Sequence, residues 1–109
     1  MSAIGYVTLN PERGSFKGTL KTLSIDTGIE IIPNREKSDD NQPDYRVFTD
    51  QRTELGAGWN RTGKTSGKDY VSLSLAAPEL GPRKIYANLG RAAGQDDDMA
   101  YAIIWNPES

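Results

Sequence analysis

The feature that most constrains the fold of this chain is an alternation of apolar and polar residues with a period of two. The alternation lasts for five to eight residues at a time, and Gly, Pro, Asn or Asp ends each run. In one such run Phe16, Gly18 and Leu20 alternate with polar residues. No apolar stripe with the 3.6-residue spacing of a helix persists for three turns. The chain is therefore predicted to be all-β.

The runs predict strands over residues 4–9, 16–24, 29–32, 45–49, 55–60, 70–76, 84–89 and 101–105. Short strands at this spacing are typical of antiparallel sheets. The predicted fold is a mainly antiparallel small barrel or two-layer sandwich of six to eight strands. A chain of 109 residues is the size of one domain. We expect a single domain over 1–109, with flexible loops at 34–44 and 90–99.

The composition excludes several kinds of chemistry. The chain has no Cys and no His. This removes disulfides, thiolate nucleophiles, zinc sites of the usual kind, and hydrolases that need a catalytic His. We expect no enzyme activity, no catalytic residues, no metal and no cofactor. The N-terminus lacks the pattern of a signal peptide, and no apolar run approaches the ~18 residues of a membrane span. The expected location is the cytoplasm, without a membrane partner.

Two motifs invite a functional interpretation that their surroundings do not support. Residues 58–65 fit G-x-x-x-x-G-K-[ST], the phosphate-binding loop of nucleotide hydrolases. That loop needs a helix after it, whereas the residues after Thr65 alternate with a period of two and predict a strand. The segment is interpreted as a basic hairpin tip. The acidic run at 96–98 lacks the spacing of a calcium loop and is interpreted as solvated.

Charge is distributed unevenly along the chain. The formal net charge is −2, but residues 59–91 carry six basic and two acidic side chains, a net charge of +4. The segments on either side are both acidic. A locally basic surface can therefore exist on a chain that is acidic overall, which keeps anionic partners open.

The alternation also predicts which face of each strand a side chain occupies. Val71, Leu73 and Leu75 form the apolar set of their strand, which leaves Tyr70 on the polar face. In the same way Tyr86 is predicted to lie outside with Lys84. The two tyrosines are expected to share a polar face, beside basic side chains at the hairpin tip: Arg61, Lys64 and Lys68. The same reasoning places two rows in the core: Leu55, Ala57 and Trp59, and Tyr101, Ile103 and Trp105.

The order of these pieces is similar to a known bacterial family. The segments DYRVF at 44–48, ELGAGW at 54–59, YVSLSL at 70–75, IYANL at 85–89 and the final IW at 104–105 resemble the domain of unknown function 736 (DUF736) family. The stretches IG at 4–5 and FKGTLKTL at 16–23 also match its pattern. The resemblance implies a small bacterial protein, often encoded among plasmid or conjugative-transfer genes. The family offers no established catalytic residues to carry over to positions in this sequence.

Two functional hypotheses follow. The first is a non-catalytic accessory protein that binds nucleic acid, with a preference for single strands. Its cations (Arg61, Lys64, Lys68 and Lys84) would contact phosphates, and its aromatic rings (Tyr70 and Tyr86) would stack on bases. The second is a protein-interaction or structural module of a plasmid- or conjugation-associated system. That module would use the acidic loop 96–98 or a free strand edge, at 29–32 or near the C-terminus, and an edge would also allow a homodimer.

Overall fold

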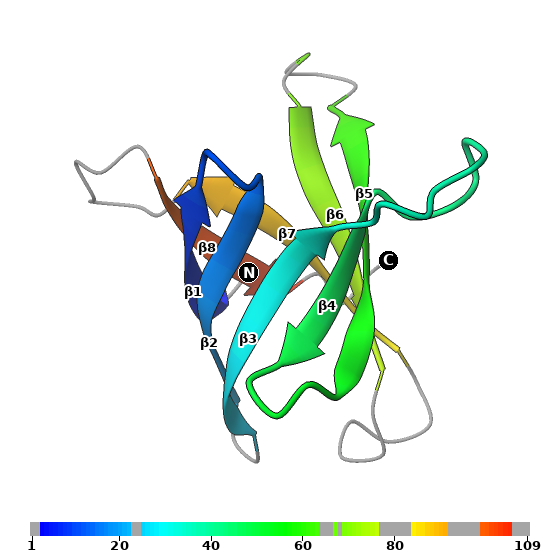
Figure 1. The fold of residues 1–109 in the computed structure, drawn as a ribbon. Helices are drawn as coiled ribbons and strands as arrows, with labels where there is room; N and C mark the ends of the chain where they lie inside the picture. The colour runs from blue at the N-terminus through cyan, green and yellow to red at the C-terminus, as the bar shows by residue number, and fades with distance from the viewer. Residues whose placement is uncertain are drawn as a thin grey trace.

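The structure is a computed structural model, and it describes residues 3–22, 25–63, 67, 69–76, 84–91 and 99–105. These residues form eight strands that alternate in direction along the chain (Figure 1). They are β1 (Ala3–Asn10), β2 (Ser15–Lys21), β3 (Asp26–Pro33), β4 (Tyr45–Thr49), β5 (Glu54–Thr62), β6 (Asp69–Leu75), β7 (Ile85–Arg91) and β8 (Ala100–Trp105). All eight predicted strands are confirmed, with shifts of a few residues at their ends.

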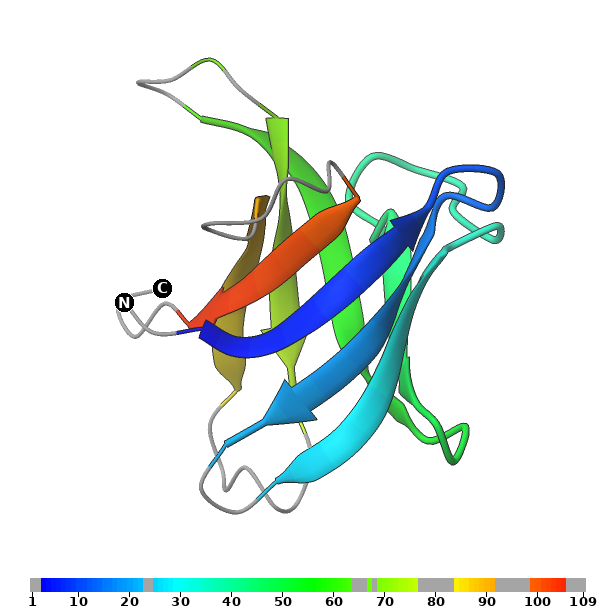
Figure 2. The ribbon, with the colours of Figure 1, turned by 90° about the vertical axis from the view of Figure 1, so that its left-hand side faces the viewer.

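Each strand pairs with its neighbours in the chain, and β8 pairs with β1 to close a barrel. Figure 2 shows β1 and β8 side by side where the barrel closes. All pairings are antiparallel, so the prediction of an antiparallel all-β fold is confirmed and the barrel alternative is the correct one. The prediction of free edges at 29–32 and near the C-terminus is wrong. Strand β3 pairs with both β2 and β4, and β8 pairs with both β7 and β1.

The interior of the barrel is packed with apolar side chains. The largest fully buried ones come from five strands: Leu20, Ile31, Val47, Leu73, Leu75 and Ile103. Near one end, the ring of Phe16 packs edge-on against Tyr101, with centroids 5.3 Å apart, and against Tyr45 at 6.1 Å. An eight-stranded barrel is just wide enough for side chains to fill it. The core therefore holds the strands in place as a rigid support for their outer face.

Inward-facing glycines allow close contact between neighbouring strands. A Cβ atom at Gly18 would overlap the backbone of Tyr6 and Val7, and one at Gly56 would overlap the backbone of Ser74. Glycine within a strand often marks a place where another backbone approaches closely or a barrel strand bends. Both residues thus permit the curvature that a small closed barrel needs.

A β-bulge in β5 overturns one prediction about the core. The register between β4 and β5 shifts between Val47 and Phe48, which pair with Gly56 and Glu54 respectively. Leu55 is the extra residue, and it is buried. Beyond it the alternation changes phase, because a bulge places two residues opposite one. Ala57 and Trp59 therefore face outward, and their predicted place in the core is wrong.

The predicted inward row on β8 is only partly correct. Ile103 is fully buried, and Tyr101 packs on Phe16 within the barrel. Trp105 pairs with the buried Ala87 and so has the inward phase of the strand. It lies at the end of β8, however, and remains 42% exposed. The row leaves the core at that end of the barrel.

The two ends of the barrel differ in what they carry. We call the end where β1, β3, β5 and β7 finish the upper end, as in Figure 1. It carries the turn 11–14, the loop 34–44 and the facing ends of β5 and β6 at Thr62 and Asp69. The lower end carries the turn 50–53 and Lys84, just before β7. Within the described part of the chain, no helix is long and apolar enough to cross a membrane.

The loop 34–44 is fastened to the barrel by hydrogen bonds. The amide of Asn34 donates to the carbonyl of Asp44 at 2.9 Å, and the amide of Asp44 donates to the carbonyl of Gly58, also at 2.9 Å. The Asn34 side chain bonds the carbonyl of Pro43 at 3.0 Å. The loop therefore has a defined position against β5.

Candidate functional site

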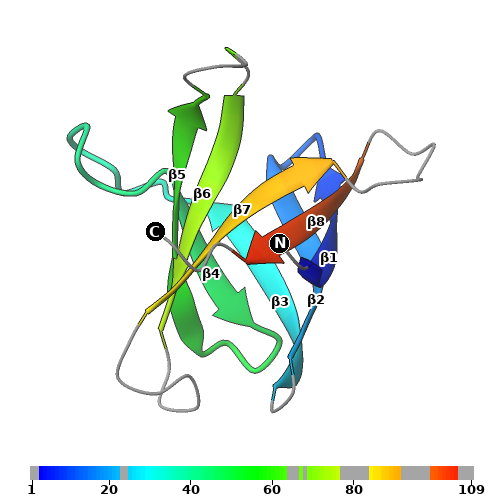
Figure 3. The same ribbon diagram turned by 180° about the vertical axis from the view of Figure 1, so that it is seen from behind.

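One side of the barrel presents aromatic and small polar side chains. It consists of the outward residues of β5 after the bulge, of β6 and of β7. We call it the tyrosine face: Ala57, Trp59, Arg61, Tyr70, Ser72, Ser74, Tyr86 and Asn88. Figure 3 shows these strands from the side of β6 and β7. The inward residues between them, Val71, Leu73, Leu75, Ala87 and Leu89, are buried. The predicted faces of β6 and β7 are thus confirmed.

The register sets the spacing of the two tyrosines on this face. Tyr70 pairs with Arg61 at the upper end, whereas Tyr86 pairs with Ser74 near the lower end. The Cα atoms of Tyr70 and Tyr86 are separated by four residues along the strand and one strand spacing, which is roughly 14 Å. Both tyrosines are 37% exposed. Between them lies the uncharged pair Ser72 and Asn88.

The predicted site residues fall into two groups. Arg61 and Tyr70 lie directly opposite each other at the upper end. Lys84, which is exposed, lies at the lower end with Tyr86. The prediction that Tyr70, Tyr86 and Lys84 share one face is confirmed for the tyrosines, but Lys84 lies far from Arg61 along the strands. Lys64 and Lys68 lie outside the described residues.

Trp59 also belongs to the tyrosine face, although the alternation pattern predicts it in the core. It pairs with Ser72, between the two tyrosines in height. Its indole Nε1 donates a hydrogen bond to the carbonyl of Asn41 at 3.4 Å, so the loop 34–44 lies against one side of the ring. The signal that identifies it is the β4–β5 bulge, which depends on pairing between strands and has no mark in the sequence of β5.

The position of that loop depends on a hydrogen-bonded carboxylate. Lys37 Nζ donates to Asp44 Oδ1 at 2.6 Å, and the amide of Asn60 donates to Asp44 Oδ2 at 2.8 Å. The Lys37 bond is the main cause that holds the pKa of Asp44 below its ordinary value, and the Asn60 amide adds to it. Burial, by contrast, raises the pKa of the neighbouring Tyr45.

The tyrosine face differs in charge from the opposite side of the barrel. Among its described residues Arg61 is the single charged side chain. On β2, β3 and β4 the outward positions include Lys17, Lys21, Glu30 and Arg46. Aromatic rings beside small polar groups offer stacking and hydrogen bonding at a low desolvation cost. The tyrosine face therefore combines exposed rings with few charges, which the opposite side does not.

A hollow of about 440 Å³ opens at the upper end, next to Tyr70. We call it the barrel mouth, and it is lined by Phe16, Asn60, Asp69, Tyr70, Val71, Leu89, Gly90 and Tyr101. Asn60 and Asp69 have the inward phase of their strands but lie above the packed core. Mouths of β-barrels are common places for small ligands. The strands of the tyrosine face thus end beside a cavity with both apolar and polar lining.

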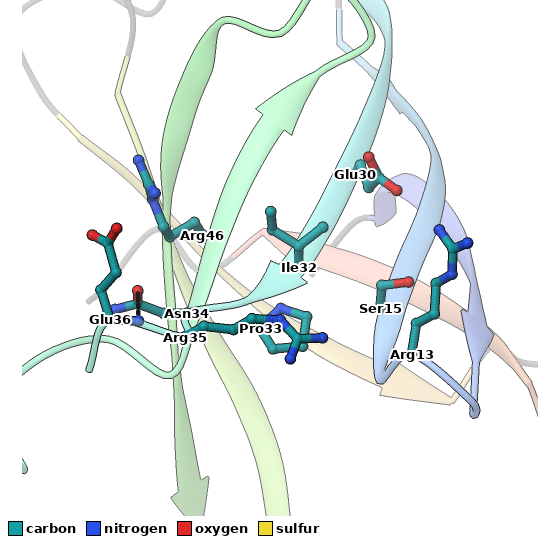
Figure 4. A pocket seen from close by; sticks show the side chains of 9 residues that line it. All are labelled: Arg13, Ser15, Glu30, Ile32, Pro33, Asn34, Arg35, Glu36 and Arg46. Atoms are coloured by element: carbon teal, nitrogen blue, oxygen red, sulfur yellow. Dashed lines mark hydrogen bonds between the residues drawn. The ribbon is translucent and has the colours of Figure 1, made fainter. Parts of the chain in front are cut away.

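A second hollow, also of about 440 Å³, lies on the outer side of β2, β3 and β4. Figure 4 shows Arg46 and Glu36 on one side of it and Arg13 on the other. It is lined by Arg13, Ser15, Glu30, Ile32, Pro33, Asn34, Arg35, Glu36 and Arg46. Arg46 donates to Glu54 at 2.8 Å and lies over the Phe48 ring at 5.1 Å. Its cations are offset by acidic neighbours, so it offers little net charge to an anion.

No group of three or more potential metal ligands occurs among the residues that the structure describes. The strands on both sides of residues 63–68 agree with a hairpin tip and not with the phosphate-binding loop of a nucleotide hydrolase. Strand β5 continues to Thr62, and the antiparallel strand β6 begins at Asp69, where a nucleotide hydrolase would have a helix. The amide of Gly67 donates to the carbonyl of Gly63 at 2.9 Å, as in a hairpin turn.

A family model described as "Protein of unknown function (DUF736)" matches residues 3–108. The chain belongs to the DUF736 family. The match covers every strand of the barrel, so the barrel belongs to the region that defines the family. Neither the curated proteins nor the solved structures contain a match to this DUF736 chain. The resemblance predicted from the sequence is confirmed.

Proposed function

We propose that this protein is a non-catalytic accessory protein that binds single-stranded nucleic acid across the tyrosine face. The observation that carries the proposal is the common outward placement of Tyr70 and Tyr86, each 37% exposed, on adjacent strands of a rigid barrel. Exposed rings on a fixed sheet are stacking surfaces for unpaired bases. Trp59, between them in height, extends the same surface.

The cations of the basic segment support the same proposal. Arg61 lies opposite Tyr70 at the upper end, and Lys84 is exposed at the lower end near Tyr86. A strand that crosses both rings would therefore meet a positive charge near each of them. Lys64 and Lys68 are proposed as further phosphate contacts from the segment between β5 and β6. Contacts of this kind make binding weaken as salt increases.

Fluorescence anisotropy with labelled oligonucleotides at low salt tests the proposal. Tyr70→Ala is expected to weaken binding by ~1–3 kcal/mol, because it removes one stacking ring. Tyr86→Ala should have a similar effect. Tyr6→Ala is the matched control, because Tyr6 is 59% exposed but lies on β1, which β8 separates from the strands of the tyrosine face. Wild-type protein that fails to bind at tens of micromolar, or equal losses in all three variants, contradicts the proposal.

A protein partner is the second candidate, favoured by the low charge of the tyrosine face. Interface centres are enriched in Tyr and Trp and depleted of Lys and Glu. The partner would be a protein of a plasmid- or conjugation-associated system, or a second copy of this chain. Co-purification from the native host after nuclease treatment separates the candidates, because a protein partner persists and a nucleic acid does not. Sedimentation of the purified chain tests self-association.

A further inference from the structure

We propose that the barrel mouth binds one nucleobase that carries an exocyclic amine, and that it discriminates against thymine and uracil. The choice of a nucleobase as the ligand rests on the proposed function. The shape and polarity of the site come from the residues that line it. The proposal adds base selectivity to a protein whose tyrosine face would bind any single strand.

The floor and walls of the barrel mouth suit a flat ring. Phe16, Val71 and Leu89 lie beneath it and are 6%, 9% and 3% exposed. Tyr101 adds an aromatic wall, and its position is held by edge-on contact with Phe16. Unpaired bases are commonly bound by stacking on aromatic side chains, with their edges free for hydrogen bonds. A base that enters the mouth would therefore find apolar contact on its faces.

The polar groups at the rim of the mouth determine which base edge fits. Asp69 Oδ1 accepts a hydrogen bond from Thr62 Oγ1 at 2.8 Å, which orients the carboxylate. An ionised carboxylate only accepts hydrogen bonds. Where the C4 position of a pyrimidine meets it, cytosine presents an amino group that donates to the carboxylate, whereas thymine and uracil present the carbonyl oxygen O4, which would face it unfavourably. Asn60, across the strand pair, offers both a donor and an acceptor for the adjacent ring atoms.

The barrel mouth is continuous with the tyrosine face. Tyr70 belongs to both, since it faces outward on β6 and also lines the mouth. A strand stacked on Tyr70 can therefore direct its next base into the mouth. This arrangement separates the two tasks: the face holds the strand and the mouth reads one base.

Free nucleosides test the mouth without the face. We would add deoxycytidine and thymidine separately to ¹⁵N-labelled protein and follow the amide resonances of Asn60, Val71 and Leu89. Deoxycytidine is expected to shift these resonances and to bind about 5- to 100-fold more tightly than thymidine, as one good base-edge contact allows. Asp69→Asn should bring the two affinities close together, because an amide both donates and accepts. Asp26→Asn removes the same charge from an exposed residue at the lower end of β3, and it should leave the ratio of the two affinities unchanged.

The proposal is overturned if neither nucleoside shifts the mouth resonances, if thymidine binds as tightly as deoxycytidine, or if Asp69→Asn retains the wild-type ratio. The proposed function fails separately. If oligonucleotides do not bind but deoxycytidine shifts the mouth resonances and binds more tightly than thymidine, the face does not hold a strand and the mouth still selects the amine. If oligonucleotides bind and the nucleosides leave the mouth unchanged, only the base selectivity is wrong.

Discussion

At the scale of single residues, the carboxylate of Asp44 accepts two charge-assisted hydrogen bonds, one from Lys37 within the loop 34–44 and one from the amide of Asn60 in β5. The pKa of its carboxyl is lowered in the folded state, so ionised Asp44 stabilises the fold at pH values above its unfolded pKa. That contribution is lost as the pH falls through the lowered, folded value. The protein should therefore lose stability in acid partly through this residue.

Denaturant unfolding of wild type and Asp44→Asn between about pH 7 and about pH 2.5 measures that loss. At neutral pH the variant should be less stable by roughly 1 kcal/mol, since the pair is half-buried. The difference should shrink below about pH 4, because protonated Asp44 no longer attracts Lys37. A difference that stays constant through the acidic range would show that the charge of Asp44 does not matter.

The two tryptophans provide a second residue-scale prediction. Trp59 lies on the tyrosine face, whereas Trp105 lies at the lower end of β8. In Trp105→Phe, which keeps Trp59, a bound oligonucleotide should quench the tryptophan fluorescence, because bases would stack near the indole. In Trp59→Phe, which keeps Trp105, the emission should stay nearly constant. Quenching of Trp105 alone would place the strand elsewhere on the barrel.

The outward placement of Tyr70 and Tyr86 could be predicted because each lies in a strand whose alternation is unbroken. The outward placement of Trp59 could not be predicted, because the bulge at Leu55 changes the phase of β5. That bulge is defined only by the pairing of β5 with β4. The barrel mouth could not be predicted either. Phe16, Asn60, Leu89 and Tyr101 are far apart in the sequence, and only closure of the barrel brings them together.

At the scale of elements, the close approach of β1 and β2 depends on Gly18. A Cβ atom there would lie 2.7 Å from the Cα of Val7, which is backbone and cannot rotate away. Gly18→Ala should reduce the free energy of unfolding by about 1–3 kcal/mol, as overpacking usually does. The measurement is urea unfolding followed by circular dichroism.

Gly90→Ala is the matched control for that experiment. Its Cβ would meet the Cδ1 of Ile104 at 3.3 Å, the far end of a side chain that can adjust. The expected loss is less than about 1 kcal/mol. Equal losses in the two variants would mean that backbone contact at Gly18 does not limit the approach of β1 and β2.

Each strand could be predicted from its own alternation, since a period of two with turn residues at the ends is a local signal. The pairing of the first strand with the last could not be predicted in this way. Closure depends on β1 meeting β8, which are at opposite ends of the chain, and neither strand carries a mark of the other. The expectation of free edges failed for this reason.

At the scale of the whole molecule, closure of the barrel determines what surface remains for binding. With every strand paired on both sides, the described sheet has no edge to which another strand could add. Recognition must then use the outer face or an end of the barrel. The tyrosine face is part of the outer face and the barrel mouth is at the upper end, and the two meet at Tyr70.

The central claim is that a single strand binds across β5, β6 and β7. The most direct measurement is a titration of ¹⁵N-labelled protein with a mixed-sequence single-stranded oligonucleotide, followed amide by amide. Binding should shift the resonances of Trp59, Ser72 and Asn88 and leave those of Lys17 and Glu30 on the opposite side nearly unchanged. Shifts concentrated on β2 and β3, or no shifts at all at low salt, would contradict the account.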